Sequence, residues 1–289
     1  MTNNYNIPAP VFNAIAKDDY KRDPSAFASV TQLCDDPFYV ALSETAPAKE
    51  PDAIDFAAIA LGKAWHDYIE RANGNENALI EERLTIDIDG AKITGALDYY
   101  NGDTCQLLDY KVSTVWAYQF KDEPGSQYQK WVKQLNIYAY MLRANGFPVK
   151  SIAVSLYIKD WSGAKGKFDP NYPTSPIIEM PIQIFTDGII EQRLRADIAK
   201  LKAARNGQGN QCSIINRWER PTVFKVMKGT NKKSSKNLPT YADAKEWADN
   251  NIKVKYDIVE HKGARVRCEG YCNYSDHCPG YQKHLKESK

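Results

Sequence analysis

The chain has 289 residues, which is long enough for one substantial core or for one domain with a smaller appendage. Its composition, 43% hydrophobic and 26% charged, is that of an ordinary globular protein, and no apolar run is long enough to cross a membrane. The net charge of +2 neither favours nor excludes a nucleic-acid partner, because a local basic groove can exist on a near-neutral protein.

The N-terminal segment MTNNYNIPAPVFNAIAKDD lacks the basic start and the apolar stretch of a secretory signal, which favours a cytoplasmic location. Thiols are usually reduced in that compartment. The six cysteines are therefore expected to include metal ligands rather than to form a disulfide framework.

Hydrophobic periodicity predicts the elements of a first domain in chain order. Residues 55–73 predict a helix with Leu61, Trp65, Tyr68 and Ile69 on its apolar stripe. Three segments then alternate apolar and polar residues around two turn signals, which predicts three antiparallel strands: 81–89, 91–100 and 105–113. A second helix, two further strands and a third helix follow at 126–146, 151–161, 176–185 and 187–207. This order predicts an α/β domain over residues 1–205, with an N-terminal helical region and a mixed sheet covered by helices.

The composition changes after residue 205. NGQGNQ is typical of a linker, and KVMKGTNKKSSKNLP is rich in lysine, serine and asparagine without periodicity. Residues 206–289 are expected to form a small cysteine-rich metal-binding unit that packs back on the first domain. A helix over 241–251 and a strand over 253–261 are predicted within it.

Two charged residues interrupt the apolar strand CQLLDYKVS. Asp109 and Lys111 are two residues apart and therefore point to the same face of a sheet. Pairing through the preceding Asn-Gly turn can bring the carboxylate of Asp98 toward Asp109. Two carboxylates and a lysine suit a hard divalent cation, with Lys111 beside the water that the metal activates. A structural ion pair on an edge strand is the alternative.

The wider pattern resembles the PD-(D/E)XK nuclease superfamily, and specifically its RecB-like exonuclease branch. GKAWH, GALDYYNGDTCQLLDYKVS and QLNIY match, in order, a helical histidine, an aspartate, a D-x-K strand and a Q-x-x-x-Y helix over residues 58–145. The matching residues are His66, Asp98, Asp109, Lys111, Gln134 and Tyr138. The resemblance implies a restriction-endonuclease-like mixed sheet flanked by helices.

The resemblance also implies the roles of these residues. His66, Asp98, Asp109 and the backbone carbonyl of Tyr110 would bind Mg²⁺ or Mn²⁺. Lys111 would orient or deprotonate the attacking water and stabilise charge on the phosphate. Gln134 and Tyr138 share a helix face and would hold Lys111 and the scissile strand, although Tyr138 could simply belong to the core.

Two residues near this set have weaker patterns. Gly62 lies four residues before His66, so it shares a helix face with that histidine and leaves room for a close approach. Glu82 lies on the strand before Asp98 and could reach the metal, but Glu81 or mere solvent exposure explains the pattern as well.

The density of cysteines in RCEGYCNYSDHC is typical of a metal loop. Cys268, Cys272 and Cys278 need a fourth ligand. Several RecB-like nucleases, including CRISPR-associated ones, end with a cysteine cluster that holds a [4Fe–4S] centre, and in those a cysteine N-terminal to the nuclease core favours Cys34. Phage-encoded nucleases with a similar tail favour Cys212, which we adopt. The alternatives are Zn²⁺, with His261 or His277 as possible ligands, and ordinary reduced cysteines.

Two further segments have open roles. The lysines of KGTNKKSSK could follow a DNA backbone or belong to a solvated loop. Trp116, Tyr118 and Phe120 alternate after the D-x-K strand and are expected in the core, with stacking on unpaired bases as the alternative.

The function implied is a metal-dependent DNA exonuclease that hydrolyses phosphodiester bonds by means of a metal-activated water. It would act on DNA ends or single strands in phage or bacterial recombination, repair or processing. A recombinase, a single-strand annealing protein or a helicase would be its partner, and no membrane is involved. A CRISPR-adaptation nuclease and a non-catalytic DNA-end-binding module are the alternatives. The intact set of His66, Asp98, Asp109 and Lys111 argues against the latter.

Overall fold

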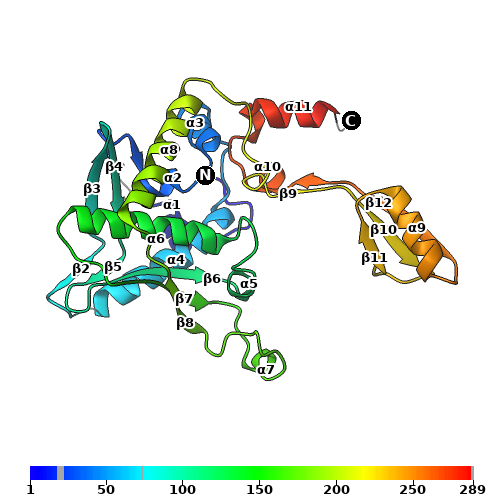
Figure 1. Cartoon of the computed structure of the whole chain (residues 1–289), viewed down its shortest axis with the longest axis horizontal. Coiled ribbons are helices and arrows are strands. Elements are labelled where there is room, and N and C mark those ends of the chain that lie inside the picture. The colour runs from blue at the N-terminus through cyan, green and yellow to red at the C-terminus, as the bar shows by residue number, and fades with distance from the viewer. Residues whose placement is uncertain (18–22, 73, 288–289) are drawn as a thin grey trace. The chain divides into compact units, whose positions relative to one another are not determined.

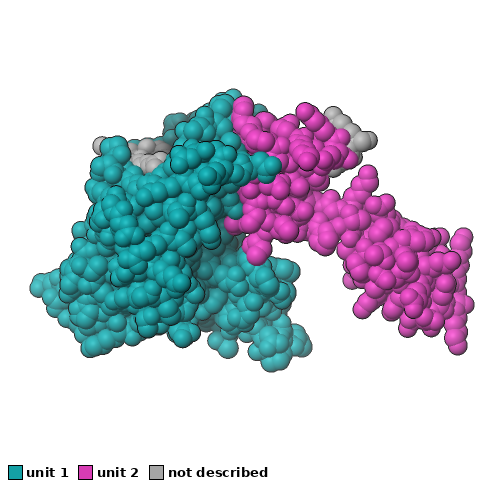
Figure 2. All heavy atoms as spheres, turned by 45° about the horizontal axis from the view of Figure 1, so that its top comes forward, with its two compact units in different colours: residues 1–210 teal, residues 211–289 magenta. Residues whose placement is uncertain are grey.

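The computed structural model describes residues 1–17, 23–72 and 74–287. Asn73, the last residue of the first predicted helix, lies outside the described residues. The chain divides into two compact units, Met1–Asn210 and Gln211–Lys289, which Figure 2 shows in different colours. The predicted boundary at residue 205 is the end of the last helix of the first unit, and the division falls five residues later.

The first unit contains two β-sheets (Figure 1). The larger sheet has the strand order β2-β5-β6-β7-β8, in which only the β6–β7 pair is parallel. Its strands are β2 Ala78–Ile80, β5 Tyr99–Asn101, β6 Gln106–Ser113, β7 Ser151–Ile158 and β8 Ile177–Ile182. The smaller sheet has the order β1-β4-β3, with β1 Ala28–Ser29, β3 Arg83–Ile88 and β4 Ala91–Ala96. This confirms a mixed α/β fold.

The helices of the first unit precede, connect and follow these strands. They are α1 Ala9–Ala16, α2 Val30–Leu33, α3 Pro37–Thr45, the short 3-10 helix η1 Ala53–Phe56, α4 Ala57–Ala72, α5 Val115–Gln119, α6 Gln127–Ala144, α7 Gly163–Gly166 and α8 Asp187–Arg205. No described helix has both the length and the apolar character needed to span a membrane.

Helix α6 is the centre of the core. It contacts β3 of the smaller sheet and β7 of the larger sheet, and its buried side chains include Trp131, Leu135 and Leu142. The predicted end of this helix is confirmed at Gly146, whose φ of +87° favours a glycine because other residues rarely adopt it. Since α6 connects the parallel strands β6 and β7, it covers one face of the larger sheet.

Helix α4 lies on the opposite face of the larger sheet. His66 of α4 contacts Tyr110 of β6, and Trp65 contacts Tyr157 of β7. Neighbouring side chains on these strands face α6, and since successive side chains of a strand point to opposite faces, the two tyrosines point away from α6. The helix predicted over 55–73 is present as α4, but its apolar stripe is not fully buried. No residue of this helix is fully buried, and Leu61 and Tyr68 are 42% and 69% exposed.

The three predicted antiparallel strands are four strands in two sheets, β3 to β6, and a further strand, β2, precedes them. The segments 81–89 and 91–100 run as one hairpin, but both strands leave one sheet and enter the other at Glu81–Glu82 and Leu97–Asp98. Two hydrogen bonds keep the hairpin continuous there, from Glu81 N to Asp98 O at 3.1 Å and from Leu97 N to Glu82 O at 3.0 Å. The division into two sheets was not predicted, because the two strands of the hairpin pair in the same way whether they stay in one sheet or pass into another.

The second unit contains a small antiparallel sheet of order β11-β10-β12 packed on α9. The core of this part comprises Val226, Ala244, Ala248 and Ile252. The bounds are β10 Val223–Lys228, β11 Lys236–Leu238, α9 Tyr241–Asn251 and β12 Tyr256–His261. The lysine-rich run KGTNKKSSK therefore contains the whole loop of a β-hairpin, with Lys228 at the end of β10 and Lys236 at the start of β11. Sequence periodicity did not reveal this hairpin.

The cysteines of the second unit lie outside that sheet. They occur in or next to a second group of short elements. These are β9 Glu219–Arg220, β13 Ala264–Arg265, α10 Val266–Gly270, η2 Ser275–His277 and α11 Pro279–Glu287. Strands β9 and β13 pair antiparallel, and α10 contacts both.

Candidate functional site

The carboxylates of Glu81 and Asp98 lie at the point where the hairpin passes from one sheet to the other. Glu81 has a φ of +49°, an uncommon value for a residue with a side chain. Such backbone strain is often found at functional sites. The sheet change therefore places two acidic residues at the end of the β5 strand, beside the edge of β6.

The backbone of Tyr110 is accessible to side chains because the short strand β5 does not extend along β6 as far as Tyr110. Strand β5 pairs with β6 only as far as Leu108, so the following part of this β6 edge lacks a strand partner. Instead, Tyr110 N donates to Asp98 Oδ2 at 2.7 Å, and Tyr110 O lies 2.8 Å from His66 Nε2. A histidine, an aspartate and a backbone carbonyl thus meet at one point of the sheet edge.

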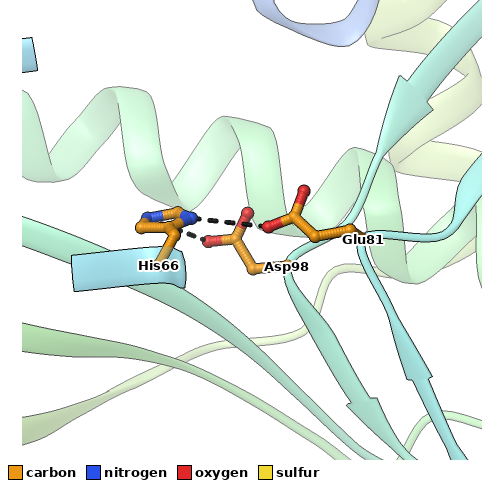
Figure 3. Close-up of side chains that lie close together, drawn as sticks. All are labelled: His66, Glu81 and Asp98. Carbon is orange, nitrogen blue, oxygen red and sulfur yellow. Dashed lines mark ion pairs between the residues drawn. The ribbon is translucent and has the colours of Figure 1, made fainter. Parts of the chain in front are cut away.

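His66 extends from α4 toward both carboxylates (Figure 3). Its Nδ1 lies 3.5 Å from Glu81 Oε1, and its Nε2 lies 3.8 Å from Asp98 Oδ2. One ligand atom from each of these three residues lies within 4.8 Å of the others, a spacing that could hold a metal ion. The structure therefore brings together His66 and Asp98, as predicted, and adds Glu81.

Asp109 and Lys111 form a close ion pair on the α6 side of β6. Asp109 Oδ2 lies 2.6 Å from Lys111 Nζ, and the aspartate side chain is only 2% exposed. Neither carboxylate oxygen accepts a hydrogen bond of good geometry from the described residues. Burying a carboxylate with so few donors is unfavourable unless another positive group approaches it.

Burial and mutual repulsion change the proton affinity of this cluster. Burial, together with the nearby Asp109 charge, raises the pKa of Asp98 to about 7. Burial lowers the pKa of His66, but Glu81, Asp98 and the Tyr110 carbonyl outweigh it, so the net change is upward. Burial likewise opposes the charged form of Lys111, while Asp109 and Asp98 raise its pKa overall. Excess negative charge in this cluster favours binding of protons or cations.

A cleft of about 950 Å³ opens beside these residues. Helix α4 contributes His66 and Gly62 to its lining, β6 contributes Lys111, and α6 contributes Gln134. The charged side chains that line it are Asp35, Asp67, Glu70, Glu81, Lys63, Lys111 and Lys130. A cation bound among the acidic groups would make this lining more favourable for a phosphodiester anion.

Gln134 and Tyr138 differ in how deeply their side chains are buried. Gln134 lines the cleft, whereas Tyr138 is only 3% exposed and packs in the main core. Burial, and secondarily the charge of Asp109, raises the pKa of Tyr138 well above its ordinary value, and a hydrogen bond with Gln134 opposes the increase. The tyrosine thus lies beneath the cleft floor, near Asp109.

Sequence reasoning did not place two residues of this region. Glu81 was only an alternative to Glu82, and no motif distinguishes two adjacent glutamates. Cys34, considered as a cluster ligand, lines the cleft instead, and burial raises the pKa of its thiol to about 12. Thr31, Cys34 and Asp35 are close in the chain, and their position in the lining of the cleft depends on the fold of the N-terminal helices.

The donor set beside the cleft fits a hard divalent cation. Carboxylate and carbonyl oxygens with an imidazole suit Mg²⁺ or Mn²⁺. Asp109 lies outside the three-residue group but is close enough for its charge to raise the pKa of Asp98. Its buried oxygens, which lack well-formed hydrogen bonds, are further candidate donors.

The four predicted cluster ligands all belong to the second unit. Burial, followed by the neighbouring Cys278 and Cys272, raises the pKa of Cys268 to about 11. These three thiols therefore lie close enough to influence one another. The backbone carbonyl of Cys212 accepts a hydrogen bond from Arg217.

No protein-family model matches the chain, and no curated protein matches it. Among solved structures, the protein SSO0001 is similar with a TM-score of 0.44 and 17% identity, covering 65% of this chain and 84% of that chain. An alkaline exonuclease from Laribacter hongkongensis has a TM-score of 0.37 and 16% identity, covering 62% of this chain and 89% of that one. A phage-related exonuclease from Haemophilus somnus has a TM-score of 0.30 and 13% identity, covering 68% and 77%.

Proposed function

We propose that this chain is a metal-dependent DNA exonuclease of the RecB-like type, which hydrolyses phosphodiester bonds with a water molecule. The observation that carries the proposal is the meeting of His66 Nε2, Asp98 Oδ2 and the Tyr110 carbonyl at the β6 edge, where Tyr110 lies between the two residues of the Asp109–Lys111 ion pair. These residues belong to the motif set, with His66 on a helix and Asp109 and Lys111 on one strand.

The residues that would hold Mg²⁺ or Mn²⁺ are His66, Asp98, Asp109 and the Tyr110 carbonyl, with Glu81 beside them. When bound, the ion would supply Lewis acidity and lower the pKa of the attacking water. Its charge would also balance the two buried carboxylates, whose mutual repulsion raises the pKa of Asp98.

Lys111 is placed to act on the phosphate. Its ammonium group is held by Asp109, its side chain is 22% exposed, and it lines the cleft. A fixed positive charge in a partly dehydrated site stabilises negative charge that develops on a phosphate oxygen. Its raised pKa keeps it protonated, so this structure favours electrostatic stabilisation and water orientation over proton abstraction by Lys111.

For the second unit we propose a [4Fe–4S] cluster bound by Cys212, Cys268, Cys272 and Cys278, with Zn²⁺ as the alternative. Its role would be structural, because hydrolysis itself needs no redox centre. The density of Cys268, Cys272 and Cys278 in the sequence, within the same unit as Cys212, supports this proposal.

The test is digestion of linear DNA labelled at either end, single- and double-stranded, by anaerobically purified protein in Mg²⁺ or Mn²⁺. The variant Lys111→Ala should lose activity, while Lys150→Ala, at an exposed lysine outside the cleft, should retain it. Chelation should abolish activity in all samples. Absence of digestion on every substrate by a folded, metal-loaded protein would favour the non-catalytic end-binding module.

A further inference from the structure

An exposed pair of aromatic rings lies on α5. Trp116 and Phe120 are 65% and 36% exposed, and their rings stack with centroids 3.8 Å apart and an interplanar angle of 26°. Only Tyr118 of this aromatic trio packs against the main core. The expectation that all three belong to the core was therefore wrong for Trp116 and Phe120.

The geometry of α5 explains why these two residues separate from Tyr118. A strand would place all three side chains on one face, but in a helix residues four apart share a face. Val115, Ala117 and Tyr118 face the core, which leaves Trp116 and Phe120 together on the outer side. Their side chains thus form one apolar surface instead of two isolated ones.

This surface is close along the chain to residues that line the candidate active-site cleft. The chain enters α5 from Val112 and leaves it toward Gln127, and both residues line the cleft. Helix α5 also contacts α6, which contributes Gln127, Lys130 and Gln134 to the lining. The five steps along the chain from Lys111 to Trp116 can span at most about 18 Å, so the aromatic pair lies within a few nucleotides of the proposed scissile bond.

We infer that Trp116, supported by Phe120, is a stacking platform for an unpaired nucleobase of the DNA strand that enters the cleft. This inference rests on the proposed function and specifies its substrate as a single strand or a frayed end. Every unpaired base offers an aromatic face, whereas the bases inside a duplex are already stacked. The lysines of the cleft would bind the phosphates of the same strand.

The test measures binding separately from cleavage, with the full chain carrying Lys111→Ala and with Mn²⁺ present. Fluorescence anisotropy compares a single strand of about 15 nucleotides with a blunt duplex of the same sequence. Adding Trp116→Ala should weaken single-strand binding about 5- to 100-fold and change duplex binding less than about twofold. Trp116→Phe should retain most of the affinity, and Tyr5→Ala, an aromatic residue that is 69% exposed, should change neither.

A spectroscopic readout tests stacking directly. The fluorescent base 2-aminopurine, placed at successive positions from the strand end, should be quenched most at one position, and Trp116→Ala should remove that quenching. Equal single-strand affinity and unchanged quenching in Trp116→Ala would overturn the platform. Loss of affinity for single strand and duplex alike would overturn it too. If wild-type protein cuts no DNA but the dependence on Trp116 persists, the platform stands and the exonuclease proposal fails.

Discussion

His66 presents its two ring nitrogens to different partners: Nδ1 lies 3.5 Å from Glu81 Oε1, and Nε2 lies 2.8 Å from the carbonyl oxygen of Tyr110. A carboxylate next to one nitrogen fixes the ring orientation and favours a proton on that nitrogen. The other nitrogen is then available for a metal ion on the side where Asp98 lies. We therefore expect Glu81 to position His66, a role that the D-x-K motif does not include.

The first prediction concerns Glu81. Glu81→Gln should weaken Mn²⁺ binding about 10- to 100-fold, because the amide is a weaker partner for the imidazole and carries no charge. Glu82→Gln is the matched control, since this adjacent glutamate is also exposed but lies outside the His66 cluster. Calorimetric titration of the metal-free proteins measures both. Equal losses in the two variants would indicate a general effect of charge and contradict the positioning role.

The choice between these two glutamates shows where sequence reasoning ends. His66, Asp98, Asp109 and Lys111 belong to motifs whose spacing can be recognised in a linear chain. Glu81 instead acquires its role from the sheet change and from a positive φ that residue type does not encode. The sequence contains a weak signal of the sheet change, because Glu81, Glu82 and Asp98 have a low strand propensity and interrupt segments that otherwise alternate apolar and polar residues.

The fold was predictable where periodicity is long and unambiguous. Helices α6, α8 and α9 and strands β6, β7 and β8 lie within the predicted segments, because their apolar residues recur at one period over many positions. Helix α4 was also located, but Leu61 and Tyr68 of its apolar stripe are exposed, and Trp65 packs against Tyr157 of β7. Short elements such as α2, β1 and β11 depend on tertiary contacts and left no clear pattern.

The second prediction concerns pH. The pKa of Asp98, raised to about 7 by burial and by Asp109, exceeds its unfolded value of about 4. Its contribution to the stability of the metal-free protein is therefore complete below about pH 4 and is lost as the pH rises through about 7. The raised pKa of His66 acts in the same direction. Since a cation binds the deprotonated groups, Mn²⁺ should increase the Tm more at pH 8 than at pH 6.

Thermal unfolding of the wild type and Asp98→Asn, each with and without Mn²⁺ at both pH values, checks this. The isosteric amide removes the charge repulsion, so the metal-free variant should lose less stability than the wild type between pH 6 and pH 8. It should also respond weakly to Mn²⁺. A wild-type Tm shift that is the same at both pH values would contradict the role of Asp98 as a proton-exchanging ligand.

The third prediction separates the two cysteines that sequence patterns proposed as the fourth cluster ligand. Cys212 belongs to the same compact unit as Cys268, Cys272 and Cys278, whereas Cys34 lines the cleft of the other unit. Cys212→Ser should reduce the iron content and the absorbance near roughly 400 nm, while Cys34→Ser should leave both unchanged. The reverse result would assign Cys34 to the cluster, and zinc without iron in the wild type would reject the cluster itself.

The fourth prediction tests how tightly the floor beneath the cleft is packed. A Cβ at Gly95 on β4 would lie 2.7 Å from Tyr138 Cε1 and 2.8 Å from Val30 Cγ2, so Gly95→Ala requires the surrounding side chains to move. Overpacking of this kind costs about 1–3 kcal/mol in the free energy of unfolding. It should also displace Tyr138, which lies near Asp109, and thereby weaken Mn²⁺ binding. Denaturant unfolding and metal titration measure the two effects.

Gly62→Ala is the matched control, because no heavy atom lies within 4 Å of a Cβ added there. In the interior of α4 this substitution should stabilise the protein by about 0.5–1 kcal/mol, since alanine loses less backbone freedom than glycine. Gly62 lines the cleft, so weaker DNA binding by a stabilised Gly62→Ala protein would indicate that the strand passes close to this face of α4. Unchanged stability of Gly95→Ala would mean that Tyr138 and Val30 can move at little cost, and the cleft floor would then be looser than these distances imply.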